Sequence, residues 1–233
     1  MRKVEQLIEF EWVRCLTGYK IVATNPARKR PAWTHGKRVV TLPRWTVDGA
    51  PNAALASAGT RFELYCPTEF PALFQRFADM PATAEGMRDF ANRFGLLETP
   101  GNSRLSASIT YEATVVGDVL AHHAALRWAV DLFGAGDSPG LAQYYNAGWG
   151  QLRTQLRPQP DGKVTFVFMP SSLIQFLWIQ FALHAASNAK LLRCERCGTP
   201  FRVGTGTRRR DTAKFCSNAC KVAAFRARHA GHA

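Results

Sequence analysis

The sequence predicts an α+β fold that ends in a small module rich in cysteine. Residues 1–66 contain short apolar segments separated by Pro, Gly and Asn, a pattern typical of strands and turns. Residues 67–189 carry apolar side chains at the spacing of helix faces. Residues 190–233 hold four of the six cysteines. We therefore expect an α+β domain over 1–189, β-rich up to residue 66 and mainly helical afterwards, and a separate module over 190–233.

Four strands are expected in the β-rich part of this domain. Each is a short apolar segment, and the breakers Asn25-Pro26, Arg30-Pro31 and Asp48-Gly49 lie between them. The expected strands cover residues 7–15, 19–24, 38–42 and 61–65.

Helical periodicity begins shortly after residue 67. The first helix presents one apolar face, made by Phe70, Leu73, Phe74 and Phe77. The second begins near Thr83 and stops at Gly95, because Thr caps helix N-termini and Gly ends helices. Further helices are expected at 117–133, at 138–156 and at 171–186, with a strand at 163–169.

The four C-terminal cysteines form a C-x2-C pair and a C-x3-C pair, Cys194, Cys197, Cys216 and Cys220. Zinc takes four such ligands in a tetrahedron, and both spacings bring two sulfurs close together. Gly198 allows the chain to reverse after the first pair. Ser217 or Asn218 can cap a helix that carries the second pair. A turn, a short hairpin and a ligand-bearing helix predict a treble-clef zinc finger.

Two disulfides are the alternative interpretation of these cysteines. They require an oxidising compartment, and the N-terminal residues lack the apolar segment of an export signal. The most apolar segment, 173–186, is too short and too polar to span a bilayer. We expect a cytoplasmic protein with one structural Zn²⁺ and no membrane partner. Four thiolates leave no open position on the metal for catalysis.

Positive charge is concentrated in the module. The whole chain has a formal net charge of +13, and residues 190–233 contribute +9 from eleven Lys and Arg and two acidic residues. Such a concentration favours binding to phosphate polyanions. We expect a nucleic acid, DNA or RNA, as partner, contacted by Arg208, Arg209, Arg210, Lys214, Lys221 and Arg228. A solvated basic surface and acidic protein partners are the alternatives.

The last helix indicates a second kind of contact. Val222 and Phe225 lie opposite Cys216 and Cys220 on a helical wheel, where they need another apolar surface. We expect that surface to be the larger domain or a second subunit. A protein-docking or dimerisation module, with a homo-oligomer as one outcome, is therefore the second hypothesis.

Other candidate sites are weaker. His122 and His123 are adjacent and point about 100° apart on a helix, so they cannot both face one ion. Trp33 lies in a basic segment, 25–38, which is a candidate for a second nucleic-acid contact or an ordinary exposed loop. No phosphate-loop, dinucleotide-binding or hydrolase motif occurs. A toxin or nuclease with its site in 1–189 is the third hypothesis.

The zinc motif is similar to that of a known group. Residues 191–201, together with Lys214-Phe215-Cys216-Ser217-Asn218-Ala219-Cys220-Lys221, resemble the C-terminal zinc finger of largely uncharacterised bacterial proteins. More distantly these resemble the CGNR zinc-finger proteins, regarded as stress-linked transcription regulators. Residues 70–97 are also similar to the uncharacterised group. After Cys220 this chain has Lys221-Val222-Ala223, where the CGNR pattern has Gly-Asn-Arg. The resemblance implies zinc at the four cysteines.

Overall fold

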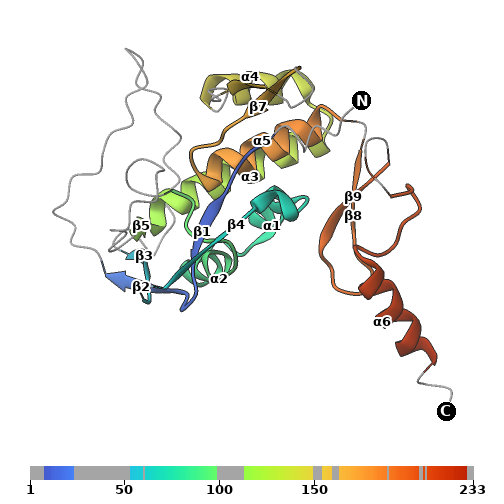
Figure 1. The fold of residues 1–233 in the computed structure, drawn as a ribbon, viewed down its shortest axis with the longest axis horizontal. Coiled ribbons are helices and arrows are strands. Elements are labelled where there is room, and N and C mark those ends of the chain that lie inside the picture. Colours follow the sequence, from blue (N-terminus) through green and yellow to red (C-terminus); the bar gives the residue numbers. More distant parts are fainter. Residues whose placement is uncertain are drawn as a thin grey trace.

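Two apolar helices, α3 (Val116–Gly134) and α5 (Leu173–Ala185), pack against each other through the middle of the larger part of the molecule (Figure 1). Helix α5 is apolar nearly all round, and Phe176, Leu177 and Trp178 on it are buried. A helix with that composition is stable only when other elements cover it on all sides. The two helices therefore form the centre of the main core.

The computed structural model describes residues 8–23, 53–59, 61–98, 113–148, 154–158, 163–187, 189–204, 207 and 209–229. The expected strand 38–42, the basic segment 25–38 with Trp33, and Arg208 lie outside these residues.

Three shorter helices surround α3. Helices α1 (Leu73–Asp79) and α2 (Ala84–Phe94) pack on one side of it, and α4 (Ser138–Gly148) packs on another. The predicted ends of α2 are confirmed. The Thr83 hydroxyl accepts a hydrogen bond of 3.1 Å from the Gly86 amide. Gly95 has a φ of +80°, and a Cβ there would lie 2.2 Å from the Val13 carbonyl oxygen, so only glycine fits.

The strands form small antiparallel sheets, which confirms the predicted α+β class. One sheet pairs β1 (Trp12–Cys15) with β4 (Phe62–Tyr65). A second has the order β2-β3-β5, with β2 at Tyr19–Ala23, β3 at Ala53–Ser57 and β5 at Ala113–Val115. A third pairs β6 (Thr154–Pro158) with β7 (Val164–Phe168). Helix α2 contacts β1 and β2, which fastens the first two sheets to the helical core.

The predicted fourth helix is too long. Helix α4 ends at Gly148, and Leu156, expected inside the helix, lies in β6 opposite Phe166 of β7. Glycine at the helix end and the cross-strand apolar pair outweigh the weak helical periodicity of this segment. Strand β3 (Ala53–Ser57) was not expected, because its alanines give little β signal.

The first helix also starts later than its periodicity indicates. Phe70 precedes α1, and a 3-10 turn occupies Pro67–Glu69. The 3-10 segment ends before Phe70, and Ala72, the residue before α1, has a left-handed φ of +61°.

One buried polar side chain joins two of the core helices. Gln180 of α5 accepts a hydrogen bond of 3.0 Å from the Phe74 amide through Oε1. Its Nε2 donates to the Phe70 carbonyl at 3.0 Å. The side chain therefore satisfies backbone groups at the start of α1 that no helical bond can reach. In the described part of the chain, none of the helices has the length and apolar character needed to cross a bilayer.

Candidate metal centre

A tight hairpin presents the first cysteine pair. Strands β8 (Lys190–Arg193) and β9 (Pro200–Val203) pair antiparallel with Arg193 opposite Pro200, so Cys194 and Cys197 lie in the connecting turn. The Cys194 amide donates to the Thr199 carbonyl at 3.0 Å, and the Gly198 amide donates to the Cys194 carbonyl at 2.8 Å. Gly198 has a φ of +69°, a conformation that glycine adopts without strain.

The second pair lies at the start of a helix, as predicted. Helix α6 (Asn218–His229) begins directly after Ser217, whose hydroxyl accepts a hydrogen bond of 3.1 Å from the Cys220 amide. Ser217 is therefore the N-cap. Cys216 precedes the helix and Cys220 lies in its first turn, so both thiols are presented at the same end of α6.

The four thiols converge on one point. One ligand atom from each of Cys194, Cys197, Cys216 and Cys220 lies within 4.8 Å of all the others. Cys197 Sγ is 3.5 Å from Cys216 Sγ and 3.7 Å from Cys220 Sγ, and the last two are 3.6 Å apart. No other group of this kind occurs among the residues that the structure describes. The cluster can hold one metal ion, and its four soft donors suit a metal that binds thiolates.

Local hydrogen bonds lower the pKa of two of the thiols, which favours metal binding. The Thr199 hydroxyl and amide bond to the Cys197 sulfur and lower the pKa of its thiol to about 6. Burial raises the pKa of Cys194, but backbone hydrogen bonds from Cys216, Cys197 and Arg196 outweigh it, so the pKa is lower than usual. Hydrogen bonds to a thiolate favour the charged form, which is the form that binds metal.

Cys216 differs from these two. Burial, followed by hydrogen bonds shared with the neighbouring thiols, raises its pKa to about 12. Burial of Cys216 and the hydrogen bonds that its protonated thiol shares with its neighbours therefore oppose complete deprotonation of the four sulfurs, and the charge of Cys194 adds to this effect. A divalent cation at the centre offsets these effects, and metal binding is coupled to loss of the protons.

We call residues 190–229 the cysteine module. Its own core is very small, since its buried hydrophobic cluster consists of Cys194, Phe201 and Val203, beside the buried Pro200. Arg209 covers this core, with its guanidinium 5.2 Å from the Phe201 ring centroid and a hydrogen bond of 3.3 Å to the Phe215 carbonyl. So few buried side chains cannot stabilise about 40 residues, and a metal ion held by the four cysteines would supply the missing stabilisation.

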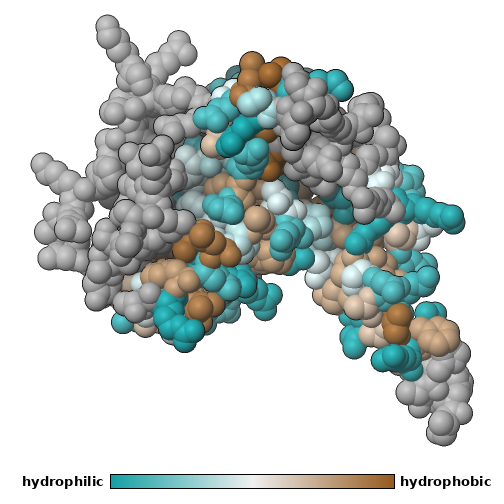
Figure 2. All heavy atoms as spheres, in the orientation of Figure 1, coloured by the Kyte–Doolittle hydropathy of each residue, from teal (hydrophilic) through white to brown (hydrophobic). Residues whose placement is uncertain are grey.

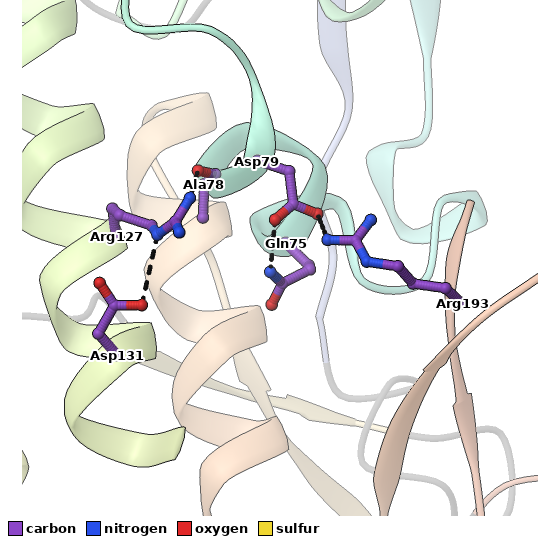
Figure 3. A network of polar contacts seen from close by, with 6 residues as sticks. All are labelled: Gln75, Ala78, Asp79, Arg127, Asp131 and Arg193. Carbon is purple, nitrogen blue, oxygen red and sulfur yellow. Dashed lines mark hydrogen bonds and ion pairs between the residues drawn. The ribbon is translucent and has the colours of Figure 1, made fainter. Parts of the chain in front are cut away.

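The module contacts the larger domain at defined points. Arg193 in β8 donates a hydrogen bond of 2.6 Å to Asp79 at the end of α1, and Gln75 donates to the same carboxylate at 2.9 Å (Figure 3). Arg202 in β9 donates to the Ser187 hydroxyl at 3.1 Å, just after α5. These contacts hold the module beside the end of α1 and the residues that follow α5.

Arg76 brings a cation from the larger domain close to the cysteines. It lies on α1, with its guanidinium 5.9 Å from the Phe70 ring and 6.0 Å from the Phe94 ring. Burial lowers the pKa of Arg76, and the charges of Cys216 and Cys197 oppose that shift. Sequence reasoning missed this residue, because an arginine on a short helix gives no sign of a partner about 120 residues away.

The residues expected to contact nucleic acid differ in their exposure to solvent. Arg210, Lys214, Lys221 and Arg228 are exposed. Lys214 pairs with Glu195 at 3.1 Å, in an ion pair that is open to solvent. Arg209 is half-buried and engaged with Phe201, as described above. The module exposes further cations that were not singled out, namely Lys190, Arg193, Arg196 and Arg226.

The larger domain does not cover the apolar face of α6. Val222 and Phe225 are 39% and 57% exposed. Of the two surfaces expected to cover them, the larger domain does not do so, and a second subunit remains a prediction. The reason is geometric: α6 points away from the larger domain beyond its first turn (Figure 1). Ala223 and Ala227, which lie on the same side of the helical wheel as Cys216 and Cys220, are exposed as well.

The two adjacent histidines have separate surroundings. His122 Nε2 lies 3.7 Å from Glu98 Oε1, whereas the His123 ring packs edge-on against Phe77 at 5.6 Å. Burial lowers the pKa of both imidazoles. They therefore serve the packing of α3 and do not share an ion.

No protein-family model and no curated protein sequence matches this chain.

Proposed function

We propose that this protein binds nucleic acid through a C-terminal treble-clef module organised by one structural Zn²⁺, and that it acts as a bacterial transcription regulator. The observation that carries the proposal is the surface charge of the cysteine module. Its exposed cations are Lys190, Arg193, Arg196, Arg210, Lys214, Lys221, Arg226 and Arg228. A surface of this composition attracts phosphates strongly.

Zinc is the metal that the donor set favours. Four thiolates in a closed cluster are the usual ligands of structural zinc. The Zn²⁺ would be held by Cys194, Cys197, Cys216 and Cys220, and its net charge with four thiolates is about −2. Residues 190–233 would then keep a net charge of about +7, since their formal charge is +9. The metal would fix the direction of α6 relative to the hairpin.

Elemental analysis tests the metal. Protein prepared without chelator should contain one equivalent of zinc, and Cys216→Ser should lose it. Cys15 is buried in the larger domain and Cys66 is half-buried there, so Cys15→Ser and Cys66→Ser are matched controls that should keep the metal. A stoichiometry that falls equally in the controls would contradict the assignment.

Salt dependence tests the nucleic-acid interface. Binding can be measured by fluorescence anisotropy with labelled duplex DNA, single-stranded DNA and RNA. The affinity should fall steeply between 50 and 200 mM salt. On duplex DNA, the logarithm of the binding constant should fall with the logarithm of the salt concentration with a slope of about 0.9 for each phosphate contact. Arg210→Gln/Lys214→Gln should reduce that slope. The control pair Lys20→Gln/Arg61→Gln removes exposed charges from the larger domain and should not. Binding that ignores salt would reject the proposal.

The regulatory role has its own test. Nucleic acid that co-purifies with the protein at low salt should be duplex DNA enriched in promoter sequences when it is sequenced. Enrichment of RNA, or of DNA without any recurring sequence, would oppose transcription regulation and leave nucleic-acid binding in place.

A further inference from the structure

Helix α6 is anchored at one end only. Its first turn is fixed by Cys216 and Cys220 of the thiol cluster and by the Ser217 cap. From residue 221 to residue 228 every residue is exposed except Ala224, which is half-buried. Figure 2 shows this part of the molecule as a narrow projection that leaves the larger domain. Because so few side chains of this 12-residue helix are buried, packing contributes little to its stability beyond the first turn, and we expect a binding partner to cover the exposed part.

The charges on α6 indicate the chemistry of that partner. The helix sequence contains no Asp or Glu. At 100° per residue, Lys221 and Arg228 lie about 20° apart on one flank of Phe225. Arg226 lies on the other flank, about 40° beyond Val222. The helix therefore presents a narrow apolar strip with cations on both sides, which fits a groove whose two walls are negative.

The dimensions of α6 match one groove in particular. Most of the other positions, which belong neither to the cations nor to the apolar strip, are alanines, at residues 219, 223, 224 and 227. Because alanine side chains are small, the helix is slim. An α-helix with its side chains is about 10–12 Å across, and the major groove of B-form DNA is about 12 Å wide. The minor groove is about 6 Å wide and excludes a helix. The major groove of A-form RNA is too narrow and deep for side chains to read.

We propose that α6 enters the major groove of duplex DNA. Val222 and Phe225 face the base edges, where thymine methyl groups offer apolar contact. Lys221 and Arg228 face the phosphates of one strand, and Arg226 faces those of the other. The inference rests on the proposed nucleic-acid binding and adds the type of nucleic acid, the groove and the element that reads it.

A second copy of the chain is the rival occupant of the apolar strip. Two α6 helices packed through Val222 and Phe225 would bring three cations from each copy together without any acidic residue on either helix. Stable interfaces bury about 800 Å² per partner, which two apolar side chains on a slim helix do not approach. The repulsion between the cations and the small area of the apolar strip both favour DNA over a second copy of the chain as the partner.

The experiment uses the full chain with bound metal and three probes: a duplex DNA selected from a random library, a non-selected duplex, and an RNA duplex. Wild type should bind the selected DNA at least about tenfold more tightly than the RNA duplex. Binding should protect guanine N7, which lies in the major groove, from methylation by dimethyl sulfate.

Two double variants separate the role of the apolar side chains from that of the cations. Val222→Ala/Phe225→Ala should lose about tenfold in affinity for the selected DNA and keep the salt slope. Arg226→Gln/Arg228→Gln should lower the slope by about 1.8, at about 0.9 per contact. Because these side chains are exposed, circular dichroism and zinc content should match wild type in all of them.

The outcomes distinguish two failures. If no nucleic acid binds, the proposed function itself fails. If DNA binds but N7 is not protected, if the RNA duplex binds as tightly, or if both α6 variants behave as wild type, the groove assignment is overturned and nucleic-acid binding stands. If light scattering shows a dimer that Val222→Ala/Phe225→Ala dissociates while DNA affinity is unchanged, the strip serves a second copy and the assignment is overturned.

Discussion

Arg193 in β8 donates a hydrogen bond of 2.6 Å to Asp79 at the end of α1, and this ion pair joins the residue before Cys194 to the larger domain. Asp79 also accepts a hydrogen bond from Gln75, which holds its carboxylate in place (Figure 3). Cys194, the first cysteine of the cluster, is therefore one residue away from a fixed point on another part of the fold.

Breaking this pair should loosen the module with little loss of overall stability. In a double-mutant cycle with Asp79→Asn and Arg193→Gln, we expect a coupling free energy of about 0.5 kcal/mol, because the Arg193 side chain is largely exposed. Trypsin should cleave near residues 186–190 faster in either variant. The control cycle uses Arg88 and Asp89, neighbouring residues of α2 paired at 2.9 Å, which should not change that cleavage rate. Equal cleavage in all variants would contradict the linking role.

Arg76 should strengthen metal binding through its charge. Removing a cation near Cys216 and Cys197 leaves the thiolate cluster less well compensated, so Arg76→Gln should lower zinc affinity by about tenfold. Competition with a chromophoric chelator measures this, and Arg76→Lys should restore part of the affinity. Arg88→Gln on α2 is the control, because Arg88 pairs with Asp89 instead. If Arg76→Gln leaves the zinc affinity unchanged, the charge of Arg76 does not contribute to metal binding.

Gln180 should contribute to stability through two backbone partners. Gln180→Leu leaves the Phe74 amide and the Phe70 carbonyl unpaired in the core, so the free energy of unfolding should fall by about 2–4 kcal/mol. Urea unfolding monitored by tryptophan fluorescence measures the loss. Gln143→Leu, an exposed position on α4, should change stability by less than about 0.5 kcal/mol. Equal effects of the two substitutions would refute the role of Gln180.

His184 should make the fold sensitive to acid. Burial, together with the charge of Arg202, lowers the pKa of His184 from 6.5 to about 4. Between these values the unfolded chain binds more protons than the folded one, so stability is full above pH 6.5 and falls as the pH drops toward 4. The loss reaches about 3 kcal/mol, at 1.36 kcal/mol per unit. Unfolding free energies at pH 7 and pH 5 should therefore differ less in His184→Gln than in wild type.

The sequence predicted features that depend on local chemistry. The four cysteines converge because each pair lies within a few residues, on a turn with Gly198 and at a capped helix start. The ends of α2 at Thr83 and Gly95 were predictable for the same reason, since capping and left-handed glycine are properties of single residues. The zinc identity, the nucleic-acid contacts and the division at residue 189 remain predictions.

Features that depend on distant partners were not predictable. Leu156 becomes part of a strand because β7 lies beside it, and the alanine-rich β3 is a strand because β2 and β5 flank it. The proximity of Arg76 to the cysteines depends on how α1 packs against the module, which no local pattern encodes. The exposure of Phe225 has the same origin, because a helical wheel shows which face is apolar but not whether anything covers it.

The one-ended attachment of α6 has an evolutionary consequence. Residues 221–228 belong neither to the thiol cluster nor to the main core, and all of them except the half-buried Ala224 are exposed, so substitutions at these exposed positions should affect folding little. Substitutions that keep the helix can therefore change the surface that residues 221–228 present, while the thiol cluster and the main core stay the same.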